Sequence, residues 1–151
     1  MTRPATCGIA STAATSTLPE RVTHSAEETE AVGEELAPLL APGDLLLLAG
    51  ELGAGKTTFV RGLARGLGVT APVQSPTFQL VRVYPGRVQL AHVDLYRLES
   101  GAELADLGLD ELLDEGVVAV EWGDRLRLDY PRTRRIEFQA PDRTVRLIRQ
   151  P

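Results

Sequence analysis

The chain has 151 residues, of which 43% are hydrophobic and 25% charged, and its formal net charge is −5. These values are ordinary for a soluble protein, and the length suffices for one domain with its own core. The single cysteine, Cys7, excludes a disulfide framework and a cysteine-based zinc site, and no apolar stretch approaches the roughly 18 residues that span a bilayer. We therefore expect a cytoplasmic protein with no membrane contact.

The N-terminal part of the chain divides into a tail and the start of a domain. Residues 1–20 are rich in Thr, Ser and Ala and show no hydrophobic periodicity, which predicts a disordered tail. We expect residues 21–151 to form the folded domain, with a short strand at 21–24.

A helix is predicted next. Ser25 and Glu28 have the spacing of a capping box, in which the two residues satisfy each other's backbone N–H groups. The periodicity predicts that the helix continues over residues 30–40 with one apolar face. That face contains Val32, Leu36, Leu39 and Leu40.

A glycine-rich loop lies between a predicted buried strand and a predicted helix. A turn at residues 42–44 leads into the apolar run 45–49, which is typical of a parallel strand buried on both faces. The helix is expected over residues 56–67, with Gly68 at its C-terminal end.

The rest of the chain alternates predicted strands with short helical segments. Hairpin turns are expected at Pro85-Gly86 and around residues 140–142. Strands are predicted at 78–84, 87–95, 117–120, 134–139 and 144–148, and helical segments at 100–108 and 109–113. These elements predict a single α/β domain, P-loop NTPase-like, whose mixed sheet is parallel at its centre and antiparallel at its margins.

The loop matches the pattern G-x-x-x-x-G-K-[ST], which wraps backbone N–H groups around phosphate oxygens at the N-terminus of a helix. Lys56 would bridge the β- and γ-phosphates of ATP, Thr57 would ligate Mg²⁺, and Thr58 would reach the α-phosphate. The alternative is a glycine-rich turn with a surface lysine. The residues expected to hold the nucleotide are Gly50, Glu51, Leu52, Gly53, Ala54, Gly55, Lys56, Thr57 and Thr58.

Lysine usage supports this assignment. The chain has fifteen arginines and one lysine, and that lysine is Lys56. An ammonium group is a compact point charge, whereas a planar guanidinium does not suit a site crowded by amides and phosphate oxygens.

Two carboxylates are candidates for the magnesium site. Asp94 ends the strand 87–95, and Glu121 follows the apolar run 117–120. A carboxylate at the end of such a strand is poorly hydrated unless it meets a cation or hydrogen-bond donors. The sequence does not decide which of the two ligates the metal, and each could be an ordinary strand-end acid.

Other polar residues carry weaker signals. Thr77, in the segment 75–78, could sense the γ-phosphate, although an ordinary turn is favoured for this segment on its own. His92 is expected to be a packed strand residue rather than a ligand. Residues 132–151 contain six arginines and two acids, so they could contact RNA, but a solvated hairpin face is favoured.

Four segments together resemble those of a known family, in order and in spacing. They are residues 50–59 (GELGAGKTTF), 75–78 (SPTF), 94–98 (DLYRL) and 121–122 (EW). The chain resembles the bacterial TsaE family (also called YjeE), the ATPases of tRNA threonylcarbamoyladenosine biosynthesis, over roughly residues 22–138. One departure is Gly123, which stands where the family usually has proline.

The resemblance implies a P-loop protein with low intrinsic ATPase activity that uses ATP and Mg²⁺. It implies that the chain works with the TsaD and TsaB proteins to make N6-threonylcarbamoyladenosine at position 37 of tRNAs that read ANN codons. It would meet tRNA through that complex, and it would not transfer the carbamoyl group itself.

The resemblance also assigns roles to residues. Lys56 and Thr57 match the phosphate and magnesium positions, and Ser25 lies in a segment that resembles the one near the adenine. Candidate catalytic residues are Lys56, Thr77, Asp94 and Glu121, and candidate metal ligands are Thr57, Asp94 and Glu121.

Two other functional classes are open. A small P-loop kinase of a metabolite would fit the length and the fold, although no arginine-rich lid or acceptor-binding insert is visible. A nucleotide-gated binding module with negligible turnover would also fit. Phosphate transfer without partners would support the kinase, and single-turnover hydrolysis with and without partners would separate the module from an ATPase.

Overall fold

The computed structural model describes residues 20–51, 53–74, 80–95, 108–122 and 130–139, and the backbone of residues 144–149. The expectations for residues 1–19, for the segment 75–78, for residues 100–107 of a predicted helix and for a turn at 140–142 lie outside these residues. Within them no helix is long and apolar enough to cross a bilayer.

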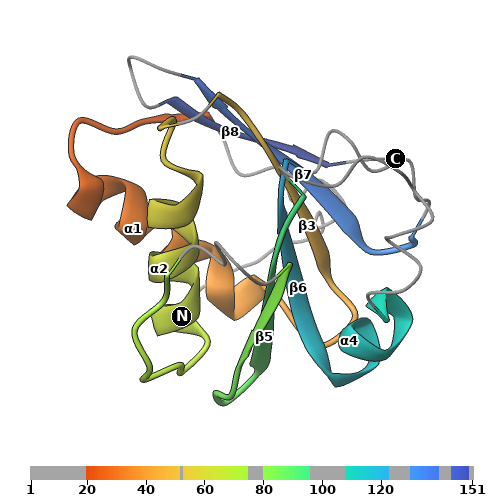
Figure 1. Cartoon of the computed structure of the whole chain (residues 1–151). Helices are drawn as coiled ribbons and strands as arrows, with labels where there is room; N and C mark the ends of the chain where they lie inside the picture. The colour runs from red at the N-terminus through yellow and green to blue at the C-terminus, as the bar shows by residue number, and fades with distance from the viewer. Residues whose placement is uncertain are drawn as a thin grey trace, which may run out of the picture.

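Helices lie on both faces of one sheet (Figure 1). The helical elements are α1 (Ala26–Leu36), the 3₁₀ turn η2 (Ala37–Leu39), α2 (Lys56–Gly66) and α4 (Leu109–Glu115). The strands are β2 (Arg21–Val22), β3 (Leu45–Ala49), β4 (Val81–Tyr84), β5 (Gln89–Asp94), β6 (Gly116–Glu121), β7 (Thr133–Gln139) and β8 (Thr144–Arg149).

The sheet has the mixed architecture that the sequence predicts. Its strand order is β2-β8-β7-β3-β6-β5-β4. The four central strands β7, β3, β6 and β5 run parallel to one another, whereas β4 pairs antiparallel with β5 at one margin, and β8 pairs antiparallel with β7 and with β2 at the other. The P-loop α/β fold class is therefore confirmed.

Alternation along β3 divides the core into two layers. Leu46 and Leu48 pack with α1 and α2 on one face of the sheet, and Leu45 and Leu47 pack with α4 on the other. All five residues of β3 are buried, because helices cover both faces of a central parallel strand. This rigid strand carries the glycine-rich loop at its carboxyl end.

Helix α1 begins as predicted and ends earlier. Ser25 caps it by accepting a hydrogen bond from the Glu28 backbone N–H at 3.2 Å. The α-helix stops at Leu36, and a 3₁₀ turn containing Pro38 follows. Leu39, which was expected on the buried face, is instead 50% exposed, because the tighter turn shifts its side chain out of the α-helical phase.

Glycines allow α1 and α2 to pack in close contact. A Cβ atom at Gly62 of α2 would lie 1.8 Å from the Glu30 carbonyl oxygen of α1, and one at Gly33 would lie 2.3 Å from the Phe59 carbonyl oxygen. Only glycine fits at such distances. The close packing fixes the N-terminal turn of α1 beside the start of α2: a Cβ at Gly55 would lie 3.6 Å from Cγ2 of Thr29.

Candidate functional site

The site lies at the carboxyl ends of β3, β5 and β6. The glycine-rich loop follows β3, Asp94 ends β5 and Glu121 ends β6. Asp94 and Glu121 are direct register partners, and Glu121 is also the partner of Leu48. The fold therefore brings together the loop and the two carboxylates that the sequence predicts, at the edge where open α/β sheets bind ligands.

The loop backbone needs its glycines. Gly50 leaves β3 with φ 153°, and a Cβ there would lie 2.7 Å from the carbonyl oxygen of Phe138. Gly55, the N-cap of α2, has φ 110°, in the left-handed region that L side chains rarely adopt. Because no side chain caps α2, the N-terminus of this helix faces the loop with its own N–H groups.

The side chain of Lys56 folds back onto the glycine-rich loop. Its side chain is buried, and its ammonium donates hydrogen bonds to the carbonyl oxygens of Gly50 and of Glu51, the latter at 3.3 Å. The same nitrogen lies 3.8 Å from the centroid of the Trp122 ring. A buried ammonium with these partners is a feature of the site and excludes the alternative of a surface lysine.

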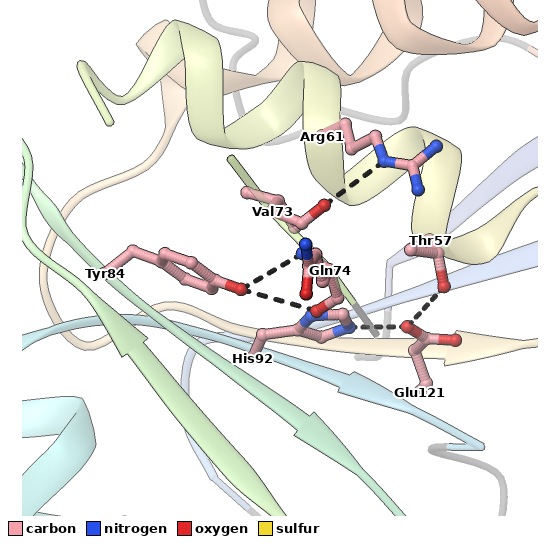
Figure 2. A network of polar contacts seen from close by, with 7 residues as sticks. All are labelled: Thr57, Arg61, Val73, Gln74, Tyr84, His92 and Glu121. Carbon is pink, nitrogen blue, oxygen red and sulfur yellow. Dashed lines mark hydrogen bonds and ion pairs between the residues drawn. The ribbon is translucent and has the colours of Figure 1, made fainter. Parts of the chain in front are cut away.

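Thr57, His92 and Glu121 meet between α2 and the sheet, as Figure 2 shows. The Thr57 hydroxyl donates to Oε2 of Glu121 at 2.8 Å, and Nε2 of His92 lies 2.5 Å from the same oxygen. His92 is fully buried and Glu121 is 5% exposed. The loop threonine and the strand-end acid that were both expected at a magnesium ion are thus already in contact.

The surroundings of Glu121 favour its ionised form. Burial opposes ionisation and by itself raises the pKa of the carboxyl. The hydrogen bond and charge interaction with His92, the hydrogen bond from Thr57 and the charge of Lys56 act in the opposite direction. They outweigh burial, and the pKa of Glu121 lies below its ordinary value.

Asp94 is half-buried beside Glu121, and its backbone N–H donates to the Leu80 carbonyl oxygen at 3.0 Å. Among the described residues no group of three or more His, Cys, Asp or Glu side chains could hold a metal ion by itself.

The structure describes some of the remaining predicted residues and not others. Thr58 lies in the first turn of α2 and is half-buried. Ser25 caps α1, and the structure does not test its expected place near the adenine. Leu52, Thr77 and Gly123 lie outside the described residues.

Sequence reasoning missed two polar contacts next to the loop. His92 is a packed strand residue, as expected, but it also bonds to Glu121. Thr23 and Thr29 share a buried hydroxyl–hydroxyl bond of 2.6 Å at the start of α1. The available signal for the first contact was that His92 lies two residues before Asp94, on the same face of its strand, while Asp94 and Glu121 end two strands that were expected to be parallel.

A buried parallel strand, a glycine-rich phosphate-type loop, a helix and two strand-end carboxylates define the class of P-loop proteins. The sequence profile of the family described as threonylcarbamoyl adenosine biosynthesis protein TsaE matches residues 23–148. The chain belongs to the TsaE family.

Individual relatives agree with this assignment. A Streptomyces coelicolor protein named tRNA threonylcarbamoyladenosine biosynthesis protein TsaE is 52% identical over 110 residues, which cover 64% of this chain and 74% of the relative. A protein of the same name from Aquifex aeolicus is 41% identical over 135 residues, covering 87% of this chain and 95% of the relative. The crystal structure of Bacillus subtilis YdiB is similar with a TM-score of 0.69 at 36% identity, covering 87% of this chain and 82% of that one.

Proposed function

We infer that this protein is an ATP-binding and weakly hydrolysing subunit required for N6-threonylcarbamoyladenosine modification of tRNA. In this proposal it acts in the cytoplasm with TsaD and TsaB, at position 37 of tRNAs that read ANN codons. The observation that carries the nucleotide part is the 2.8 Å bond from Thr57 to Glu121 beside the buried Lys56. The tRNA part rests on membership of the TsaE family, whose name states that pathway.

The residues of the loop fit a triphosphate. The N-terminus of α2 supplies N–H groups that no side chain caps, and Lys56, the first residue of the helix, supplies a positive charge. In the proposal, the ammonium leaves the carbonyl oxygens of Gly50 and Glu51 and pairs with the phosphates, which are stronger acceptors.

Thr57 and Glu121 fit a magnesium ion held between the loop and β6. Oxygen donors are the ligands that this ion prefers, and a hydroxyl with a nearby carboxylate is the usual protein contribution in P-loop sites. Bound magnesium would neutralise charge on the phosphates during transfer to water. Glu121, ionised at neutral pH, would hold the ion or its water, with Asp94 as the neighbouring second carboxylate.

The state of Lys56 also bears on the proposed low intrinsic activity. Its ammonium is held by two carbonyl oxygens and by the Trp122 ring, and these contacts have to be exchanged before it can stabilise a transferring phosphoryl group. In the proposal, TsaD and TsaB favour the exchanged arrangement and thereby raise turnover.

Reconstitution of the modification tests the proposal. Unmodified tRNA is incubated with TsaD, TsaB and the remaining components of the reaction, with this chain, without it, or with the Glu121→Gln variant. Threonylcarbamoyladenosine is measured by mass spectrometry of the digested tRNA. A matched control is Glu35→Gln, an exposed acid on α1 that pairs with Arg21 at 3.0 Å.

We expect modification to require the chain and to be lost with Glu121→Gln but retained with Glu35→Gln. Modification that proceeds equally without the chain would refute the tRNA role. Transfer of phosphate from ATP to a metabolite in the absence of partners would instead identify a kinase.

A further inference from the structure

We propose that His92 is a positioning residue that holds Glu121 in the orientation needed at the magnesium ion. This role rests on the nucleotide function proposed above. Three elements meet at the carboxylate: Thr57 comes from α2, His92 from β5 and Glu121 from the end of β6 (Figure 2).

Both hydrogen bonds to the Glu121 carboxylate end on one oxygen. Oε2 accepts from Thr57 at 2.8 Å and lies 2.5 Å from Nε2 of His92. An ionised carboxylate can only accept, so the facing ring nitrogen of His92 must carry the hydrogen. Within the described part of the chain Oε1 makes no hydrogen bond, which leaves it available for a metal ion or for water bound to the metal.

The two bonds differ in how the ion affects them. The Thr57 hydroxyl is itself an expected ligand of the ion, and it can bind magnesium through an oxygen lone pair while still donating to Oε2, so its position depends on the bound metal. His92 is fully buried in β5, and its ring remains where it is. The bond from His92 is therefore the one that orients the carboxylate whether or not the ion is bound, as residues behind metal ligands commonly do.

Without this bond, the burial of the His92 side chain would have an uncompensated free-energy cost. Its neighbours on the same face of the sheet include the fully buried Leu90 and Ala119. Nδ1 is buried and has no hydrogen-bond partner among the described residues, which is unfavourable for a polar atom. An apolar side chain would avoid that cost, and the contact with Glu121 is what a histidine adds.

The test compares side chains that differ in where they place an N–H group. His92→Gln carries its amide nitrogen at about the reach of Nε2, whereas His92→Asn carries it at about the reach of Nδ1, and His92→Leu has none. For each full-length variant, the affinity for a non-hydrolysable ATP analogue is measured in EDTA and over a magnesium titration. ATP hydrolysis is measured over the same titration.

We expect His92→Leu and His92→Asn to bind the analogue in EDTA within about twofold of the unchanged chain. The magnesium concentration that gives half of the added affinity should rise by about tenfold or more, the usual effect of removing a residue behind a metal ligand. His92→Gln should recover most of this loss. A residue with only a packing role would change the melting temperature and leave the magnesium dependence as it was.

The outcomes separate this role from the proposed function. If the unchanged chain binds the analogue with magnesium but all three variants show the same magnesium dependence as it does, the positioning role is refuted and the ATPase assignment stands. If the unchanged chain does not bind the analogue, the proposed function fails first. Should His92→Leu not fold, the Gln and Asn variants decide, because equal behaviour of these two amides would also refute the role.

Discussion

The ammonium of Lys56 lies 3.8 Å from the centre of the Trp122 ring, and the backbone of Trp122 has a φ of 62°. This left-handed conformation is rare for a bulky residue, and it occurs immediately after Glu121 at the end of β6. The bend places the ring over the loop lysine, where a cation–π contact forms. One strand end thus supplies both the carboxylate and the aromatic ring of the site.

Trp122 should report nucleotide binding. It is the only tryptophan in the chain, and its ring contacts the ammonium that the proposed function moves toward phosphate. We expect Mg-ATP to change the intrinsic fluorescence saturably, and we expect Lys56→Ala to abolish the change. A flat titration in a sample that binds ATP by calorimetry would show that Trp122 does not sense the ligand.

Replacing Lys56 with alanine should weaken ATP binding by about tenfold or more, because a hydrogen bond to a charged group contributes about 1.5–3 kcal/mol. Titration with a fluorescent ATP analogue measures this loss. The matched control is Arg65→Ala, which removes one positive charge from the other end of α2, where Arg65 pairs with Glu30. Near-normal affinity of Lys56→Ala would refute the P-loop assignment of the site.

Thr57→Ala, Asp94→Ala and Glu121→Ala should each reduce magnesium-dependent hydrolysis by about tenfold or more while changing nucleotide affinity in EDTA far less. The reason is their position at the loop and at two adjacent strand ends. Hydrolysis is measured with TsaD and TsaB present, and the exposed Asp114→Ala on α4 serves as the control. A wild-type rate for Asp94→Ala would assign the role to Glu121 alone.

The ionised form of Glu121 should stabilise the fold in a pH-dependent way. Its pKa is lowered in the folded chain, so this stabilisation is complete above the ordinary value of 4.5 and is lost as the pH falls through the lower folded value. Urea unfolding of the unchanged chain and of Glu121→Gln measures it. The stability difference between the two should shrink as the medium is acidified below pH 4.5. A difference that grows with acidity would mean that the carboxyl is destabilised by its surroundings.

Gly62→Ala should destabilise the protein by about 1–3 kcal/mol, the usual cost of overpacking. In an exposed helix the same change would stabilise by up to about 1 kcal/mol, so the sign of the effect is informative. The added methyl group would meet the Glu30 carbonyl oxygen. Thermal unfolding measures the loss, with Glu34→Ala as a control that removes only an exposed ion pair.

The sequence allowed much of this fold to be predicted, because its signals are local. The run of leucines in β3, the Ser25 cap and the loop glycines each determine their own segment. The strand-end placement of Asp94 and Glu121 followed from parallel strands that end at one edge. The error at Leu39 arose because Pro38 changes the helical phase, which periodicity alone does not show.

The contacts across elements could not be predicted. The bond between His92 and Glu121 joins residues 29 positions apart, and the bond between Thr57 and Glu121 joins residues 64 positions apart. Such pairs depend on strand register and on the seating of α2 against the sheet. The cation–π contact between Lys56 and Trp122 also depends on the left-handed backbone conformation of Trp122, which no residue pattern predicts.

The position of β3 in the sheet has a consequence for synthesis. Its two neighbours, β6 and β7, both come later in the chain, and β7 begins only at Thr133. In a nascent chain that has emerged only as far as β6, the edge of the apolar strand β3 that later pairs with β7 has no partner strand. Such unpaired edges can pair with strands of other chains. The C-terminal hairpin is therefore the last part of the sheet to form during synthesis. A polypeptide truncated before residue 133 should aggregate rather than fold as a smaller nucleotide-binding domain.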